Sequence, residues 1–361
     1  MPSGLYSTPW RSHRCSRAQT LPLLHFPVDN RMSHPDQTRS GSSRLWLLLL
    51  ALAACGGEVA DGAASPGEST VLPEGAEAFS FLGEPLYPPE QSEAVRAIYL
   101  ERYAEAEDAL VAAPADVDAL IWMGRRTAYL GQYRAAIDIF SHAIDLHPDD
   151  ARIYRHRGHR YLTVREPDLA IADFARAAEL TEGEPDQVEP DGLPNVMNTP
   201  TSTLQFNIWY HLALGHYVQG HLEQALAAQK ACLEVSEHPD SVVATSYWLY
   251  MTLVQLGRDE EAAEVLAGIN EDMEIIESIA YLDLLLLFKG ERTLEDLVGP
   301  SGDAATLQST TTSYGLGVWH LVNGRAAEAH AMWEKMMTSP NQWSAFGFVA
   351  AEGELSRSAV R

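Results

Sequence analysis

Two consecutive stretches of this chain, residues 117–150 and 151–184, repeat each other at a shift of 34 residues. The matching pairs are Gly124 and Gly158, Ala136 and Ala170, Ile137 and Ile171, Phe140 and Phe174, Ala143 and Ala177, and Leu146 and Leu180. A repeat of this length is one supersecondary unit, and it buries its apolar face only against its neighbours. Small residues fit where two helices cross closely, and larger apolar residues fill the space beside them. The repetition therefore predicts stacked pairs of antiparallel helices.

Glycines that would end the first helix of each pair extend this register along the chain. Gly131 has Arg165 as its counterpart 34 residues later, and further glycines follow at spacings of 37, 33 and 34, namely Gly220, Gly257, Gly290 and Gly324. Residues 165 and 220 are 55 positions apart, which is 34 plus 21. About 21 residues are therefore inserted between two repeats, and we assign them to the Pro-rich stretch 182–203.

These residues resemble the signature of the tetratricopeptide repeat (TPR) family, whose small, aromatic and Pro positions are occupied here by Gly124, Ala136, Phe140, Ala143 and Pro148. The resemblance implies an all-α fold, a right-handed superhelical α-solenoid with a loop insertion and terminal capping helices. We expect the repeat array over residues 89–343, beginning with a degenerate first repeat. A C-terminal capping helix and tail are expected over residues 344–361.

In this family the first helix of each pair lines a concave face that binds a protein or peptide partner. The positions that would point inward here are Arg125, Arg152, Arg155, His159, Asn207, Tyr210, Tyr247 and Tyr314. One short region holds a basic patch in this acidic chain, made of Arg125, Arg126, Arg152, Arg155, Arg157 and Arg160 with His156 and His159. The patch favours a carboxylate, a C-terminus or an acidic peptide on the partner. The alternative is that the arginines pair with neighbouring acids, such as Asp118, Asp149, Asp150 and Asp173. Family members that bind C-terminal carboxylates use a Lys/Asn/Arg set that this chain does not reproduce, which argues against the same ligand.

Two further interpretations remain open for the aromatic residues and the insertion. The tyrosines favour a glycan or small-molecule site as an alternative function. The insertion could be a lid or partner-contact loop, or a plain solvated loop. It could also hold a cation with Asp186, Glu189, Asp191 and Asn195, although their spacing lacks the order of a calcium loop. A hydrolase site on the insertion is a third hypothesis for function.

The N-terminal region, residues 1–54, has the organisation of a signal sequence, and Met32 is a candidate for the true start. A basic region with Arg39 and Arg44 precedes an apolar run that is shorter than the roughly 20 residues needed to span a bilayer. The run ends in Leu-Ala-Ala-Cys55, which resembles the lipobox of bacterial lipoproteins. The resemblance implies acylation of Cys55 and a lipid-anchored, periplasm-facing protein of the bacterial cell envelope, and Gly56 favours the outer membrane. The alternative is an ordinary secretory signal. Residues 55–88 are expected to form a flexible, acidic tether.

The charge and the motif content narrow the function further. The net charge is −25, and because residues 1–54 hold six Arg and two Asp (+4), residues 55–361 carry −29. Such an acidic chain repels nucleic acid, so no nucleic-acid partner is expected. Cys232 is interpreted as a buried structural thiol rather than a nucleophile. No enzyme motif is recognisable, and no cofactor or metal is expected. The sequence therefore predicts a membrane-anchored scaffold or adaptor for protein–protein interaction.

Overall fold

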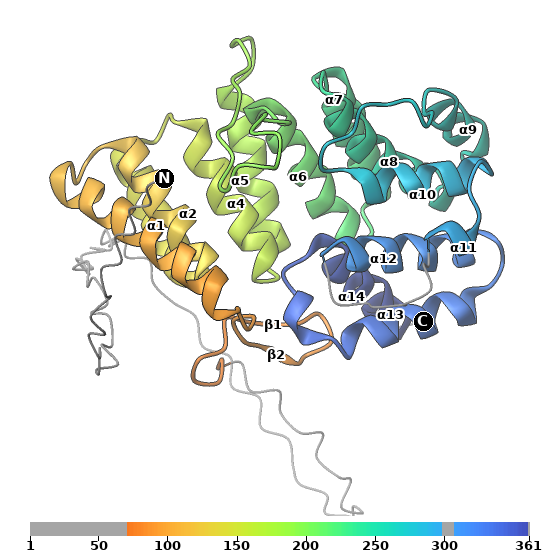
Figure 1. The fold of residues 1–361 in the computed structure, drawn as a ribbon, viewed down its shortest axis with the longest axis horizontal. Coiled ribbons are helices and arrows are strands. Elements are labelled where there is room, and N and C mark those ends of the chain that lie inside the picture. The colour runs from red at the N-terminus through yellow and green to blue at the C-terminus, as the bar shows by residue number, and fades with distance from the viewer. Residues whose placement is uncertain (1–70, 298–306, 360–361) are drawn as a thin grey trace, which may run out of the picture. The chain divides into compact units, whose positions relative to one another are not determined.

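The computed structural model describes residues 71–297 and 307–359, which are helical over most of their length (Figure 1). The helices are α1 (Glu93–Ala112), α2 (Val117–Tyr129), α3 (Tyr133–Leu146), α4 (Ala151–Thr163), α5 (Pro167–Leu180), α6 (Leu204–Val218), α7 (Leu222–Glu234), α8 (Pro239–Gln255), α9 (Asp259–Ala267), α10 (Ile279–Lys289), α11 (Leu294–Leu297), α12 (Leu307–Val322), α13 (Ala326–Met337) and α14 (Phe346–Ala359). Two short strands, β1 (Ala78–Phe79) and β2 (Pro85–Leu86), pair antiparallel. The all-α class predicted from the sequence is confirmed.

Consecutive helices pack as hairpins, and the hairpins stack in chain order. The pairs α2–α3, α4–α5, α6–α7, α8–α9 and α12–α13 are in extensive contact, and each second helix also packs against the next pair. The first helices α2, α4, α6 and α8 lie side by side along the stack. The unit that begins with α10 is the least regular, because α11 is a single turn. The predicted solenoid of helical hairpins is therefore the architecture of the described residues.

The repeated residues make equivalent contacts in the two clear repeats. A Cβ on Gly124 would lie 2.4 Å from the ring of Phe140, and a Cβ on Gly158 would lie 3.0 Å from the ring of Phe174. In both hairpins the ring therefore packs directly against the glycine backbone of the facing helix. The turn positions also match, since Gly131 has φ +82° and its counterpart Arg165 has φ +64°, a conformation that is rare for a residue with a side chain.

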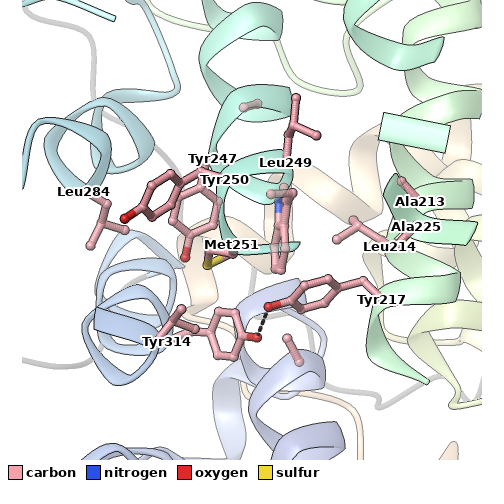
Figure 2. Packing of buried hydrophobic residues seen from close by; sticks show 14 of the residues in the cluster. Ala213, Leu214, Tyr217, Ala225, Tyr247, Leu249, Tyr250, Met251, Leu284 and Tyr314 are labelled. Atoms are coloured by element: carbon pink, nitrogen blue, oxygen red, sulfur yellow. Dashed lines mark hydrogen bonds between the residues drawn. The ribbon is translucent and has the colours of Figure 1, made fainter. Parts of the chain in front are cut away.

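The largest core cluster extends from α4 to α14 and is rich in aromatic residues. Tyr217, Trp248 and Tyr314 pack ring against ring, and the hydroxyl groups of Tyr217 and Tyr314 lie 2.8 Å apart (Figure 2). Tyr247, also labelled in Figure 2, belongs to the same cluster and packs edge-on against Trp248, with the ring centroids 5.2 Å apart. These rings come from α6, α8 and α12, so they join hairpins that are far apart in the sequence.

The expected tether over residues 55–88 is wrong for its last part. Residues 77–86 form the β-hairpin rather than a flexible linker, and they are held by polar contacts. The guanidinium Nε of Arg134 donates to Glu77 O at 2.7 Å, and the Arg134 N–H donates to the Glu77 carboxylate at 2.8 Å. Trp343 Nε1 donates to Tyr87 O at 2.6 Å. The acidic composition of this stretch did not reveal these contacts, because their partners lie at distant positions in the chain.

The C-terminal helix α14 does more than cover the last hairpin. It packs against α12 and α13 and also against α6, in the middle of the stack. Its residue Glu352 pairs with Arg165 in the α4–α5 turn and accepts a hydrogen bond from the Phe81 N–H in the β-hairpin at 3.2 Å. Figure 1 shows the β-hairpin beside the C-terminal helices, which agrees with these contacts. The end of the chain is therefore tied to the second clear repeat.

Several predictions fall on residues outside the described ranges. These are the signal region over residues 1–54, the alternative start at Met32 and the lipidation site at Cys55. Within the described residues, no helix combines the length and the apolar character needed to cross a bilayer.

Candidate functional site

The basic patch predicted from the sequence lies on α2 and α4, the first helices of the two clear repeats. Each helix begins at an Asp whose carboxylate accepts a hydrogen bond from a backbone N–H: Asp116 from Ala119 at 2.9 Å, and Asp150 from Arg152 at 3.0 Å. Such caps satisfy backbone donors that have no partner within the helix. Because the caps are 34 residues apart, the two helices start in register and place their arginines side by side.

A cavity of about 110 Å³ lies between these two helices and the insertion. Its lining includes Arg125, Tyr129, Arg155, His156, His159 and Arg160 from the helices, and Glu189 from the insertion. We refer to this site as the basic pocket. Among the described residues that line the pocket, one side chain is acidic, that of Glu189, and three are arginines. The pocket therefore carries an excess of positive charge.

The insertion contacts two arginines of the pocket and the neighbouring Arg126 with side-chain and backbone oxygens. Arg155 Nε lies 2.8 Å from Glu189 Oε2, and the two side chains are only 8% and 10% exposed. Arg125 Nη2 donates to Pro190 O at 2.9 Å, and Arg126 Nη1 donates to Gly192 O at 2.7 Å. The segment 189–192 thus contacts three arginines, Arg155 through an ion pair that is not a well-aligned hydrogen bond, and Arg125 and Arg126 through hydrogen bonds to two carbonyl groups.

The electrostatics of the pocket follow from burial and from like charge. Burial lowers the pKa of Arg155, an effect that the nearby Glu189 carboxylate opposes, and burial lowers the pKa of Arg160 to about 10. The pKa of His156 is well below its usual value because of burial and because of the adjacent Arg155. The pKa of His159 is lowered well below its usual value by burial and by Arg160. At neutral pH the histidines are therefore uncharged, and the positive charge is that of the arginines.

His159 connects the pocket to the rest of the stack. Its ring centroid lies 4.6 Å from that of His211 on α6 and 5.2 Å from that of Phe346 on α14. His211 is held in place by Asn207, whose backbone oxygen lies 2.5 Å from His211 Nδ1. Burial and Arg155 lower the pKa of His211 well below its usual value. The side of the pocket formed by His159 thus rests on α6 and the C-terminal helix.

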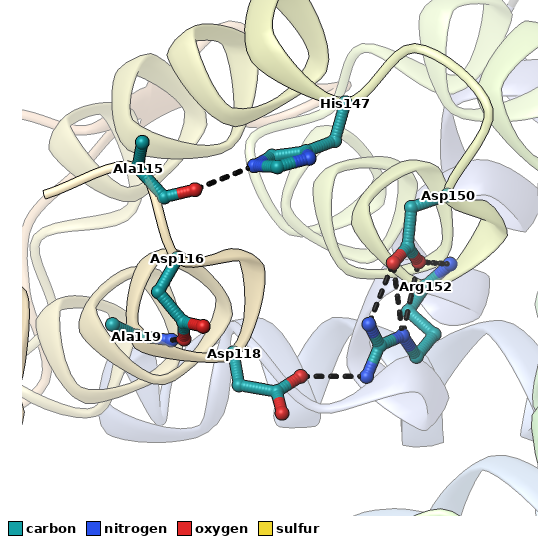
Figure 3. A network of polar contacts seen from close by, with 7 residues as sticks. All are labelled: Ala115, Asp116, Asp118, Ala119, His147, Asp150 and Arg152. Atoms are coloured by element: carbon teal, nitrogen blue, oxygen red, sulfur yellow. Dashed lines mark hydrogen bonds and ion pairs between the residues drawn. The ribbon is translucent and has the colours of Figure 1, made fainter. Parts of the chain in front are cut away.

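The alternative reading of the basic patch, pairing with neighbouring acids, is correct for Arg152. Arg152 donates to both oxygens of Asp150 and also to Asp118 Oδ1 at 2.7 Å (Figure 3). Its guanidinium is therefore occupied at the start of α4, and it does not line the basic pocket. Arg157, which the patch also includes, pairs with Asp173 at 2.7 Å.

The residues predicted on the later helices do not line a groove. Tyr247 and Tyr314 are 0% exposed, and Asn207 and Tyr210 are buried as well. Tyr210 accepts a hydrogen bond from Trp248 Nε1 at 2.8 Å. The prediction that these aromatic and amide side chains line a concave face is therefore wrong. Helices α10, α12 and α14 pack against this side of the stack, so the side chains lie in the core.

The insertion does not gather its acidic residues into a cation site. Glu189 is paired with Arg155, and Asp186 Oδ1 accepts hydrogen bonds from the Gln187 and Gln205 N–H groups. Among the described residues, no three His, Cys, Asp or Glu side chains are grouped so that they could hold a metal ion. Cys232 is buried, and burial raises the pKa of its thiol to about 12, which agrees with a structural thiol.

Two parts of this site were not predicted from the sequence. Glu189 was expected in a possible cation site, whereas its carboxylate lies against Arg155. Trp122 was not expected at the site, and its ring lies 4.3 Å from the Arg125 guanidinium and 4.6 Å from that of Arg126. A pattern of Arg125 and Arg126 three and four residues after Trp122 is a usable signal, because such residues share a helix face.

The chain is similar in fold to several solved tetratricopeptide proteins. They are YrrB, described as a TPR protein with an unusual peptide-binding site (15% identity, 66% of this chain and 95% of that chain, TM-score 0.37), PilF of Pseudomonas aeruginosa (16%, 64% and 96%, TM-score 0.39) and the TPR domain of P58(IPK) (13%, 73% and 95%, TM-score 0.22). No family model matches the sequence, and no curated protein matches it.

Proposed function

We propose that this protein is a scaffold that binds an acidic segment of a protein partner in the basic pocket. The observation that carries the proposal is the charge of the pocket, where Arg125, Arg155 and Arg160 meet one carboxylate from the described residues. Buried arginines that are not fully paired favour an incoming carboxylate, which forms short, charge-assisted hydrogen bonds with a guanidinium. A stack of helical hairpins also presents the extended surface that scaffold proteins use for partners.

We further propose that the scaffold is attached to a membrane of the bacterial cell envelope, facing the periplasm, through acyl chains on Cys55. The support for this proposal is the Leu-Ala-Ala-Cys sequence that follows the apolar run. Each buried CH₂ of an acyl chain contributes about 0.8 kcal/mol to membrane binding, so several chains would hold the protein firmly. Membrane fractionation tests the anchor: Cys55→Ala should release the protein from the membrane pellet. Equal sedimentation of both forms would rule out the anchor without affecting the pocket.

Site-directed photo-crosslinking tests the partner site in the native membrane. A benzophenone amino acid replaces Tyr129, whose ring lines the basic pocket, and the control carries it at Glu264, which is exposed on α9. The expected result is a protein adduct at position 129 that is absent at position 264. The adduct should also be lost with Arg160→Met, which keeps the length of the side chain and removes its charge. The same adducts with and without Arg160→Met would argue against recognition by charge.

The tyrosines that favoured a glycan or small-molecule site lie in the core, so no described observation supports that alternative. A hydrolase on the insertion is likewise not proposed, because Glu189 is paired with Arg155 rather than with a second acid or a base.

A further inference from the structure

We propose that residues 189–192 of the insertion are a built-in ligand of the basic pocket, and that the acidic segment of the partner binds by displacing them. We call residues 189–192 the internal ligand. This inference rests on the function proposed above and adds the regulation of the same site. It also defines the ligand class, an extended segment that carries a Glu or Asp side chain.

The contacts of the internal ligand are those expected of a bound peptide. Its first residue places a carboxylate 2.8 Å from Arg155 Nε, and its second and fourth residues present backbone oxygens to Arg125 and Arg126. Extended peptides commonly bind through main-chain hydrogen bonds for affinity and side-chain pockets for specificity. A partner segment with an acidic residue followed by free carbonyl groups would make the same three contacts.

The surroundings of the internal ligand indicate that it can leave. The remainder of the insertion makes little apolar contact: Val188, Val196 and Met197 are exposed, with Val196 at 96%. A segment with few buried apolar contacts opens at low free-energy cost. The base of the insertion is anchored separately, since the Leu204 N–H donates to Gln187 O and Thr201 Oγ1 donates to the Glu277 carboxylate at 2.5 Å. The Glu189 N–H also donates to Ser202 O, and opening breaks this hydrogen bond. The loop could therefore open outward while its two ends stay paired.

The charge of the pocket determines what can replace the internal ligand. If Glu189 left alone, Arg155 would lose the one carboxylate that pairs with it among the described residues, and a buried charge without a partner is costly. The closed state is therefore favoured until another anion enters. The pocket volume of about 110 Å³ admits a carboxylate together with water.

Gly192 supplies a second, steric way to open the pocket. A Cβ at this position would lie 1.5 Å from the hydroxyl oxygen of Tyr129, so a side chain there requires the loop or the Tyr129 ring to move. Gly192→Val should therefore push the loop out without removing any charge. Glu189→Gln should open it by weakening the contact with Arg155. Glu184→Gln is the matched control, because it removes the same charge from an exposed position of the same insertion.

The test measures binding of a fluorescein-labelled peptide with the sequence of residues 186–194 and blocked ends, by fluorescence anisotropy, to the full-length protein in detergent. A tethered ligand acts at a millimolar effective concentration, so it competes strongly with free peptide. The Glu189→Gln and Gly192→Val proteins should therefore bind the peptide more tightly than the wild-type protein, with a dissociation constant lower by on the order of 10-fold. Glu184→Gln should match wild type. Circular dichroism should show the same helix content in all four proteins.

Other outcomes separate this inference from the proposed function. If wild type and both opened variants bind the peptide equally, the internal ligand does not compete and the inference is overturned, while the acidic site remains. If a peptide with Gln in place of its Glu binds as well as the original, charge recognition fails and the proposed function fails with it. Hydrogen exchange gives an independent readout: excess peptide should speed exchange of residues 189–199 in wild type, and unchanged exchange would overturn the displacement.

Discussion

Arg165 and Glu352 form a buried, two-point ion pair although 187 residues separate them in the sequence. Arg165 Nη2 lies 2.7 Å from Glu352 Oε1, and Arg165 Nε lies 2.9 Å from Glu352 Oε2, with side chains that are 2% and 0% exposed. The guanidinium also donates to Thr163 O and to Trp343 O. These contacts join the α4–α5 turn to the C-terminal helix.

Glu352→Ala should therefore lower the free energy of unfolding by about 3–5 kcal/mol, because it leaves the guanidinium of Arg165 buried without its counterion. Urea denaturation followed by circular dichroism measures this loss. The control is Lys230→Ala, which breaks the exposed Lys230–Glu261 pair and should cost less than about 1 kcal/mol. Equal effects of the two substitutions would show that the buried ion pair between Arg165 and Glu352 does not form.

Two buried tyrosines should respond in opposite ways to loss of their hydroxyl groups. Tyr314→Phe removes the 2.8 Å hydrogen bond with Tyr217 and should lower the free energy of unfolding by about 0.5–1.5 kcal/mol. The Tyr247 hydroxyl is buried and has no hydrogen-bond partner among the described residues. Tyr247→Phe should therefore leave the free energy of unfolding unchanged or raise it by about 1 kcal/mol. Thermal unfolding of both variants checks the sign, and a loss at Tyr247 would contradict this arrangement.

Equivalent glycines of the two clear repeats should differ in how they tolerate a methyl group. At Gly124 the added Cβ would lie 2.4 Å from the Phe140 ring, and at Gly158 it would lie 3.0 Å from the Phe174 ring. Both variants should be overpacked, with a cost of about 1–3 kcal/mol, and Gly124→Ala should be the more destabilised. The midpoints of urea denaturation decide the order. A reversed order would mean that the two hairpins are packed differently from this structure.

The histidines around the basic pocket predict a loss of stability on mild acidification. The pKa values of His156 and His211 are lowered by burial and by Arg155, so below a pH of about 6.5 the unfolded chain binds protons that the folded chain does not. The free energy of unfolding should therefore fall between pH 7 and 5.5, by up to about 1.4 kcal/mol per pH unit for each histidine. Arg160 and Glu189 also line this region, and Arg160 lowers the pKa of His156 and His211 further.

Urea denaturation at several pH values measures this slope. The variant that carries both His156→Gln and His211→Gln should lose a large part of it, and His159, whose pKa is lowered in the same way, should account for much of the remainder. If the double variant keeps the wild-type slope, other groups are responsible for the dependence on pH.

The sequence was sufficient for the repeat architecture because that architecture is local. The contacts of Gly124 with Phe140 and of Gly158 with Phe174 lie within single hairpins, so they recur at the period of the repeat. The turn at Gly131 is likewise encoded where it occurs. Its counterpart Arg165 is the informative exception: an arginine in a left-handed conformation is held there by its contacts with Glu352, which no local pattern reveals.

The candidate site was predictable only in part, because its charge balance depends on contacts between distant elements. Arg125 and Arg155 stood out as basic residues at equivalent helix faces. The spacing did not show which arginines pair with an acid. Arg152 pairs with Asp150 in its own repeat and with Asp118 in the preceding one, whereas Arg155 pairs with Glu189 from the insertion. The burial of Tyr247 was also missed, because it requires the later helices to cover that side of the stack.

A crystal structure of the Glu189→Gln protein with the 186–194 peptide bound tests the central claim most directly. We predict that the carboxylate of the peptide residue equivalent to Glu189 lies within hydrogen-bonding distance of Arg155, and that residues 189–192 of the protein have moved out of the pocket. Electron density for the protein's own segment still in place, with the peptide bound elsewhere or absent, would contradict the account.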